Sequence, residues 1–112
     1  MNMVNQLERD FVSTLENVEI IFGTHGSFRR WMPQNSKWKQ QVSAPLFDAQ
    51  MLSCYKKDKN LLQLNKDKIL KDFKDLFEED REFIDSIEFS TANSSRLLYR
   101  ANKLNEIISK NL

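Results

Sequence analysis

The sequence has little cysteine, glycine or proline: one Cys, two Gly and two Pro among 112 residues. The lone Cys54 excludes an internal disulfide and leaves no second thiol for a Cys-x-x-Cys metal or redox pair. Because disulfides mark oxidising compartments, a single thiol indicates a reducing one. Both glycines, Gly23 and Gly26, fall in one segment that interrupts an otherwise helical pattern. Any specific role is therefore expected near that segment.

Long apolar runs and an excess of one charge are also missing. No run approaches the ~20 apolar residues that cross a bilayer, and residues 1–6 lack the basic-then-apolar pattern of a secretory signal. We therefore expect a cytoplasmic protein with no membrane segment. With 17 basic and 16 acidic residues the net charge is +1. That balance argues against binding a polyanion through bulk charge, although a local basic patch stays open.

What the chain does have is apolar side chains at helical spacing. They make up 40% of the residues, with eight Phe, and are enough for one core in one domain over residues 1–112. Six of them recur in steps of three and four and predict one inward face of a helix over residues 3–22: Val4, Leu7, Phe11, Leu15, Val18 and Phe22. Gly23 suits the left-handed residue that ends a helix.

Capping residues predict where later helices begin. Ser43, with Pro45 in the first turn, predicts a helix from about residue 44 to 55. Asn65 can cap the next one and Asp80 a short one. The last helix is expected over about 95–110, after a turn at 90–95. Inward positions are expected in the second helix at Leu46, Phe47, Met51, Leu52 and Tyr55, and in the last at Leu97, Leu98, Ala101, Leu104, Ile107 and Ile108.

The remaining segments show no regular pattern. Residues 24–42 are expected to be irregular, with one helical turn at 28–31, and residues 61–64 to form a loop. No window alternates apolar and polar residues with the period of two that a half-buried strand needs. The predicted fold class is therefore all-α, a single small helical bundle of about five to six helices.

Several short motifs follow one another in an order that resembles a known family. They are Ile21-Phe22-Gly23, Ser27-Phe28-Arg29 and Leu46-Phe47-Asp48-Ala49-Gln50, followed by Asp80, Phe83, Thr91, Arg96 and Arg100. Over about residues 11–108 this order resembles the helical segment after the ParB/sulfiredoxin-like domain of GmrSD-type proteins, which are modification-dependent restriction systems of bacteria. The family often reads IFG, AFR and LFDAL, so the chain departs at Ser27 and Gln50.

The resemblance does not carry the family's catalytic activity. The enzymatic domain of GmrSD-type proteins precedes this segment, and the chain lacks both that domain and a His-Asn-His nuclease motif. The resemblance therefore implies a non-catalytic helical module of a phage-defence system. It would need no cofactor, and it would brace a nuclease or NTPase domain or contact DNA phosphates.

One basic and aromatic cluster is a candidate for such phosphate contacts: Arg29, Arg30, Trp31, Lys37, Trp38 and Lys39. Arginine and lysine neutralise phosphates, and aromatic rings stack on bases. The candidate nucleic-acid residues are Arg29, Arg30, Lys37 and Lys39. In the alternative, Phe28 and Trp31 belong to the core while the two arginines cap helix ends or pair with acids.

Arg96 and Arg100 form a second candidate group because residues four apart share one helix face. They can bind phosphate, or clamp Asp48 or Glu88 across the bundle through the bidentate pairing that arginine makes with carboxylates. We favour the internal clamp formed by Asp48, Arg96 and Arg100, since the resemblance places both arginines on the helix that closes the module.

The other chemically distinctive residues do not predict an enzyme. His25 has no neighbouring nucleophile or carboxylate and is expected in a turn, without a metal role. Cys54 is expected to be a small buried residue. The acidic residues near Asp80 lack the spacing of a calcium loop. A near-zero net charge with Trp31, Trp38 and Tyr99 keeps another function open, a protein–protein adaptor or self-associating module with no nucleic-acid role.

Overall fold

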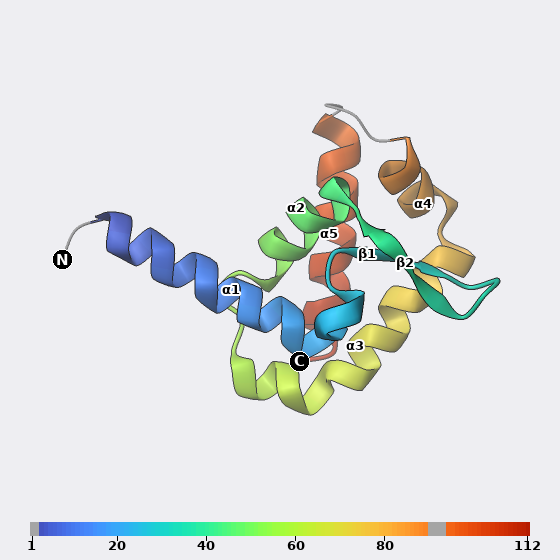
Figure 1. Ribbon diagram of the computed structural model, residues 1–112. Coiled ribbons are helices and arrows are strands. Elements are labelled where there is room, and N and C mark those ends of the chain that lie inside the picture. The colour runs from blue at the N-terminus through green and yellow to red at the C-terminus, as the bar shows by residue number, and fades with distance from the viewer. Residues whose placement is uncertain (1–2, 90–93) are drawn as a thin grey trace.

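The computed structural model describes residues 3–89 and 94–112 as five helices and one short hairpin (Figure 1). In chain order these are α1 (Met3–Gly26), β1 (Arg29–Met32), β2 (Lys37–Val42), α2 (Ala44–Cys54), α3 (Lys59–Glu79), α4 (Arg81–Glu88) and α5 (Ser94–Lys110). Helix α5 packs along α2 and α4, while α3 packs on α1 and α4. Among the described residues, no helix is long and apolar enough to span a bilayer.

The helix starts follow the predicted caps with one exception. The Ser43 side chain accepts from the Leu46 amide, and Asp80 accepts from the Phe83 amide, as predicted. The prediction that Asn65 begins the next helix is wrong. Helix α3 begins after Asp58, whose Oδ1 accepts from the Leu61 amide at 3.0 Å. The predicted loop at 61–64 is therefore helical. Most of the turn predicted at 90–95, with Thr91, lies outside the described residues.

The described chain is mainly helical, as predicted, but a two-stranded hairpin lies within residues 29–42, which were expected to be irregular. Strands β1 and β2 pair antiparallel, with Trp31 opposite Trp38 and an irregularity between Arg29 and Trp31. Five of the six β2 residues are exposed, so no period-two apolar pattern was available to predict the strand. The turn starts at Pro33 and is closed by the Asn35 amide, which donates to the Met32 carbonyl at 3.2 Å. The helical turn predicted at 28–31 is absent.

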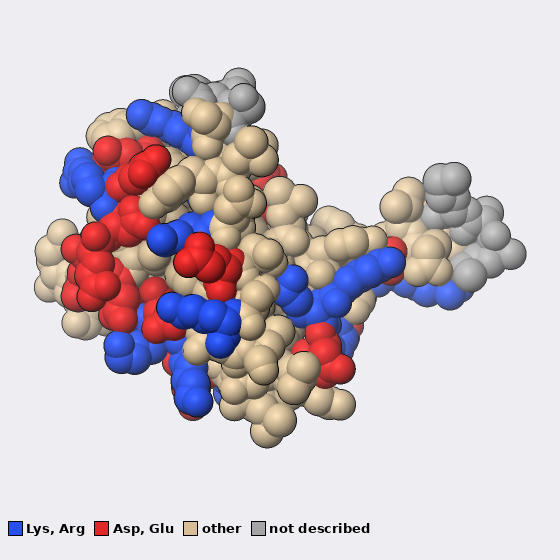
Figure 2. All heavy atoms as spheres, turned by 180° about the vertical axis from the view of Figure 1, so that it is seen from behind, with Lys and Arg blue, Asp and Glu red and all other residues tan. Residues whose placement is uncertain are grey.

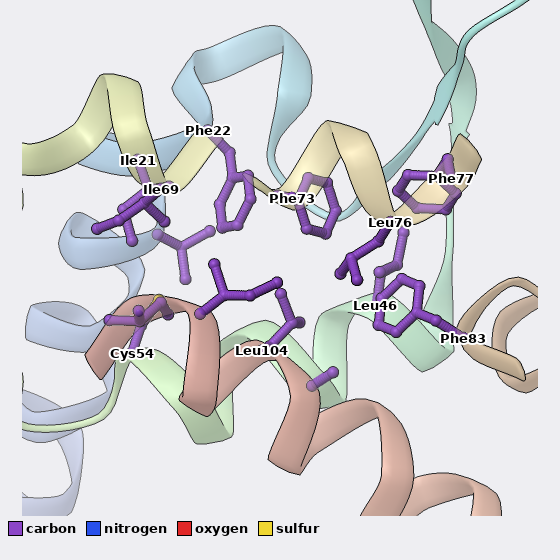
Figure 3. Close-up of a cluster of buried hydrophobic side chains, with 14 of the residues drawn as sticks. Ile21, Phe22, Leu46, Cys54, Ile69, Phe73, Leu76, Phe77, Phe83 and Leu104 are labelled. Carbon is purple, nitrogen blue, oxygen red and sulfur yellow. The ribbon is translucent and has the colours of Figure 1, made fainter. Parts of the chain in front are cut away.

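The core is a cluster of aromatic and aliphatic side chains from all five helices (Figure 3). Phe73 of α3 lies at its centre and makes edge-to-face contacts with Phe22, Phe77 and Phe83 at ring-centroid distances of 4.8, 5.3 and 6.4 Å. Such pairs contribute beyond the area they bury. Trp38 stacks near Phe73 at 6.3 Å, so the hairpin is packed against the core of the bundle.

The apolar side chains of helix α1 differ in burial between its two halves. Its C-terminal half buries Val18 and Phe22 in the core, but Val4, Leu7 and Phe11 are exposed. The prediction that the whole stripe faces inward is therefore wrong for its first three members. The N-terminal half stands away from the other elements, because the body of the molecule ends near the middle of α1 (Figure 1). We call residues 3–13 the arm.

Candidate protein-interaction surface

The arm presents an apolar face that the described chain leaves at least half exposed. Leu7 is 61% exposed and Phe11 is 50% exposed, and Val4 lies on the same face nearer the tip. This face is the continuation of the stripe that Val18 and Phe22 bury further along α1. The apolar stripe of α1 is therefore longer than the surface against which the body can bury it. Figure 2, a view from behind, shows the arm projecting from the body.

A hollow lies beside the arm, at the C-terminal end of α2. Its volume is about 380 Å³, and its lining is mainly apolar: Leu7, Asp10, Phe11, Thr14, Met51, Leu52 and Tyr55. Leu52 and Tyr55 were predicted to face inward but are exposed, as is Leu98 of α5. We define the arm–groove surface by Val4, Leu7 and Phe11 of α1 with Leu52 of α2 and Tyr55, which directly follows α2.

A buried amide sets the angle at which the arm leaves the body. The Asn17 Nδ2 donates to the backbone carbonyls of Cys54 and Lys57 at 2.9 and 3.1 Å. Its Oδ1 accepts from the Lys59 ammonium at 2.8 Å, and Lys59 also binds Ser13. These bonds fasten α1 to the connection between α2 and α3. The sequence did not single out Asn17, because an amide at the border of an apolar stripe gives no local sign that it will be buried.

Arg29 is engaged at the end of α1. Gly23 adopts φ 73° and ψ 174° and breaks the helix there. The Arg29 Nη1 donates to the Thr24 carbonyl at 3.3 Å and its Nε to the Gln40 carbonyl of β2 at 3.1 Å. The guanidinium thus satisfies carbonyls left open where the helix ends. The sequence left open whether Arg29 contacts phosphate or caps a helix end. These bonds correspond to the capping arrangement.

Arg30 is engaged on the opposite side of the hairpin. Its Nε lies 2.6 Å from the Glu88 carboxylate of α4, and its guanidinium carbon lies 5.3 Å from the centre of the Phe77 ring. Its side chain is largely buried. Pairing with a carboxylate and an aromatic face fastens α4 to the hairpin.

The four candidate phosphate ligands lie on the two strands of the hairpin, the arginines on β1 and the lysines on β2. Lys37 and Lys39 are exposed on β2. Lys39 lines one hollow of about 320 Å³ with His25, Arg29, Trp38 and Gln40, and a second one with Arg30. The two lysines present their charges to solvent, whereas the arginines use theirs within the fold.

The two arginines of the candidate clamp bond from α5 to backbone carbonyls at the end of α4. Arg100 is buried, 3% exposed, and its Nη1 donates to the Ser86 carbonyl at 3.0 Å. Burial lowers the pKa of Arg100, and the charge of Asp48, which is exposed on α2, raises it. The Arg96 Nη1 donates to the Phe89 carbonyl at 3.1 Å. Both arginines therefore hold the end of α4 against α5.

Two further groups have shifted acidities. Burial raises the pKa of the Cys54 thiol to about 12, against the opposing charge of Lys57, so the thiol stays protonated and unreactive. The prediction of a buried Cys54 is confirmed. Desolvation, together with donation to Asp80 at 2.8 Å, raises the pKa of Tyr99 to about 12.

The acidic residues around Asp80 serve the junction between α3 and α4. Asp80 ends α3, caps α4, accepts from Tyr99 and lies 3.7 Å from the Lys103 ammonium. Acidic side chains gather on the side of the molecule away from the arm (Figure 2). Within residues 3–89 and 94–112, no group of three His, Cys, Asp or Glu residues is placed to hold a metal ion.

Comparison with protein-family models, curated proteins and solved structures gave no match for this chain. The resemblance to GmrSD-type helical segments therefore remains a prediction from the motifs.

Proposed function

We propose that this protein is a non-catalytic helical interaction module that binds another protein through the arm–groove surface. The observation that carries the proposal is the exposed continuation of the α1 stripe at Val4, Leu7 and Phe11. Isolated helices shorter than ~12–15 residues are marginal in water, and fully burying a large apolar side chain contributes about 1.5–3 kcal/mol. A partner that covers this face would therefore stabilise the arm as it binds.

The kind of partner follows from the shape of the surface. A helical ridge beside an apolar hollow suits a helix-in-groove contact, in which side chains three and four apart enter the hollow. Within the body, other helices cover the same apolar stripe of α1. A partner helix would cover the part of the stripe that lies on the arm in the same way. The resemblance to GmrSD-type proteins supports the same role, the bracing of a partner domain.

Site-specific photo-crosslinking in the native host tests this proposal. A benzophenone amino acid replaces Phe11, and the matched control carries it at Leu64, an exposed residue of α3 outside the arm–groove surface. We expect a discrete adduct from position 11 that is absent from position 64 and disappears when Leu52→Glu is added. Equal labelling at the two positions, or an adduct that survives Leu52→Glu, would contradict the proposal.

A second candidate function, contact with nucleic-acid phosphates, rests on Lys37 and Lys39. Both lysines are exposed on β2, and Lys39 shares a hollow with Trp38. Substituting the two lysines leaves the internal bonds of Arg29 and Arg30 in place. Fluorescence anisotropy with duplex and single-stranded DNA should show salt-sensitive binding that Lys37→Ala with Lys39→Ala removes. Absence of binding at low salt would reject this candidate.

A further inference from the structure

We infer that the occupant of the arm–groove surface is a second copy of this chain, in a two-fold symmetric dimer with antiparallel arms. The inference rests on the proposed function and names its partner. In this dimer the two arms lie side by side and point in opposite directions. The ridge of each arm enters the hollow beside the arm of the other copy.

Shape is the first support, because a two-fold interface must be complementary to itself. The arm–groove surface has both parts on one face: Leu7 and Phe11 form a ridge, and the hollow between them and Leu52 and Tyr55 is open. An antiparallel pairing brings the tip of each arm, with Val4, towards the body of the other copy.

Area is the second support. The five side chains of the arm–groove surface are between 46% and 69% exposed. At roughly 100 Å² each they offer on the order of 500–600 Å² per copy, so two copies would bury about 1,200 Å² with their polar rims, the lower bound of specific interfaces. Five of the twelve large hydrophobic side chains exposed in the described residues belong to this surface. The area therefore reaches what a specific dimer needs.

Charge is the third support. The net charge of +1 gives two copies little mutual repulsion. On the surface itself, Asp10 lines the hollow and Lys56 is exposed beside Tyr55 at its rim. When two such surfaces face each other, Asp10 of each copy can pair with Lys56 of the other at the edge of the apolar contact. Pairs at such a rim set orientation more than affinity.

Sedimentation equilibrium of the full chain from low micromolar to several hundred micromolar tests the inference. We expect a reversible monomer–dimer equilibrium. Leu7→Glu should weaken it at least tenfold, because each copy then places a charge in the apolar contact. The matched variant Leu64→Glu introduces the same charge on an exposed leucine of α3, 79% exposed, and should dimerise as the unaltered chain does. Leu52→Glu repeats the test from the α2 side should Leu7→Glu fail to fold.

A monomer throughout this range would overturn the dimer, as would association that Leu7→Glu and Leu52→Glu leave intact. Failure of the dimer and failure of the proposed function are distinguishable. If the chain is monomeric but position 11 crosslinks to a different protein, the interaction module stands and only the second copy is rejected. If position 11 crosslinks no better than position 64, both are rejected.

Discussion

Two glycines hold the junction between α1 and the hairpin, and each is needed for a different reason. Gly23 has φ 73° and ψ 174°, a backbone conformation essentially restricted to glycine. Gly26 lacks this conformation but lies against Trp38, whose Cε2 would be 2.7 Å from an added Cβ. The sequence indicated a helix end at Gly23, whereas the need for Gly26 depends on a tryptophan twelve residues further along the chain.

Gly26→Ala should destabilise the protein by about 1–3 kcal/mol, because the methyl group would overlap the rigid indole of Trp38. Urea unfolding followed by circular dichroism measures this free energy. A double-mutant cycle with Trp38→Phe is the control, since the smaller ring should recover part of the loss. Purely additive effects of the two substitutions would show that the contact with Trp38 is not the cause.

Tyr99 should add a pH dependence at the alkaline end. Its pKa in the folded protein is raised from 10.0 to about 12, by desolvation and by its bond to Asp80. Folding therefore favours the protonated phenol, so the contribution to stability is complete below pH 10 and is lost as the pH rises from 10 to about 12. Chemical denaturation of Tyr99→Phe should show a shallower decline over that window. A decline as steep as that of the unaltered chain would contradict this assignment.

Among the elements, the helices were predictable where a local signal marked them. Ser43 and Asp80 cap α2 and α4 through bonds to amides three residues away, which are contacts that a sequence can display. The start of α3 was misplaced because Asp58 and Asn65 are both competent caps and only packing selects between them. Leu62 is fully buried, so the helix start after Asp58 is stabilised by placing this side chain in the core.

The hairpin was missed because its strands are defined by two tryptophans and not by alternation. Trp31 and Trp38 lie opposite each other at a ring-centroid distance of 5.0 Å, and Lys74 of α3 lies 4.0 Å from the centre of the Trp31 ring. A cation over an aromatic face stabilises such a packing. The contact with Lys74 joins residues far apart in the chain, beyond any local pattern.

The arm offers a prediction at the scale of a single helix. Arg9 is exposed on the side of α1 opposite the apolar stripe, so its substitution changes helix propensity without touching the arm–groove surface. Arg9→Gly should lower the stability of the arm helix by about 1 kcal/mol and weaken dimerisation. The matched variant Arg9→Ala should dimerise at least as well as the unaltered chain. Equal dimerisation of the two variants in sedimentation experiments would show that the arm need not be helical to bind.

For the whole molecule, association should be linked to stability. A dimer that forms only from folded chains raises the melting temperature as the protein concentration rises. We expect this rise in calorimetry of the unaltered chain and of Leu64→Glu, and a melting temperature independent of concentration for Leu7→Glu. Because Leu7 lies outside the core, Leu7→Glu at low concentration should melt close to the unaltered chain. A large drop there would show that the arm belongs to the folding unit.

For the candidate site, the sequence indicated which residues have the relevant chemistry but not which groups they contact in the fold. It offered Arg29 and Arg30 as phosphate ligands or as structural groups, and only the positions of Gln40 and Glu88 place these side chains within the fold. It predicted Leu7 and Phe11 as inward-facing because helical spacing reports that a face is apolar, not what covers it. Asn17 was missed because its bonding partners lie in the distant connection between α2 and α3.

The sequence by itself determined the helical content, most helix boundaries and the apolar stripe of α1, because caps and periodicity act between residues a few positions apart. The tertiary structure alone decided that the stripe of α1 extends beyond the body, that a hairpin packs on Phe73, and that Arg29 and Arg30 bond to groups of the fold itself. These outcomes depend on contacts between segments distant in the chain, whose free energies are set by the complete packing of the core.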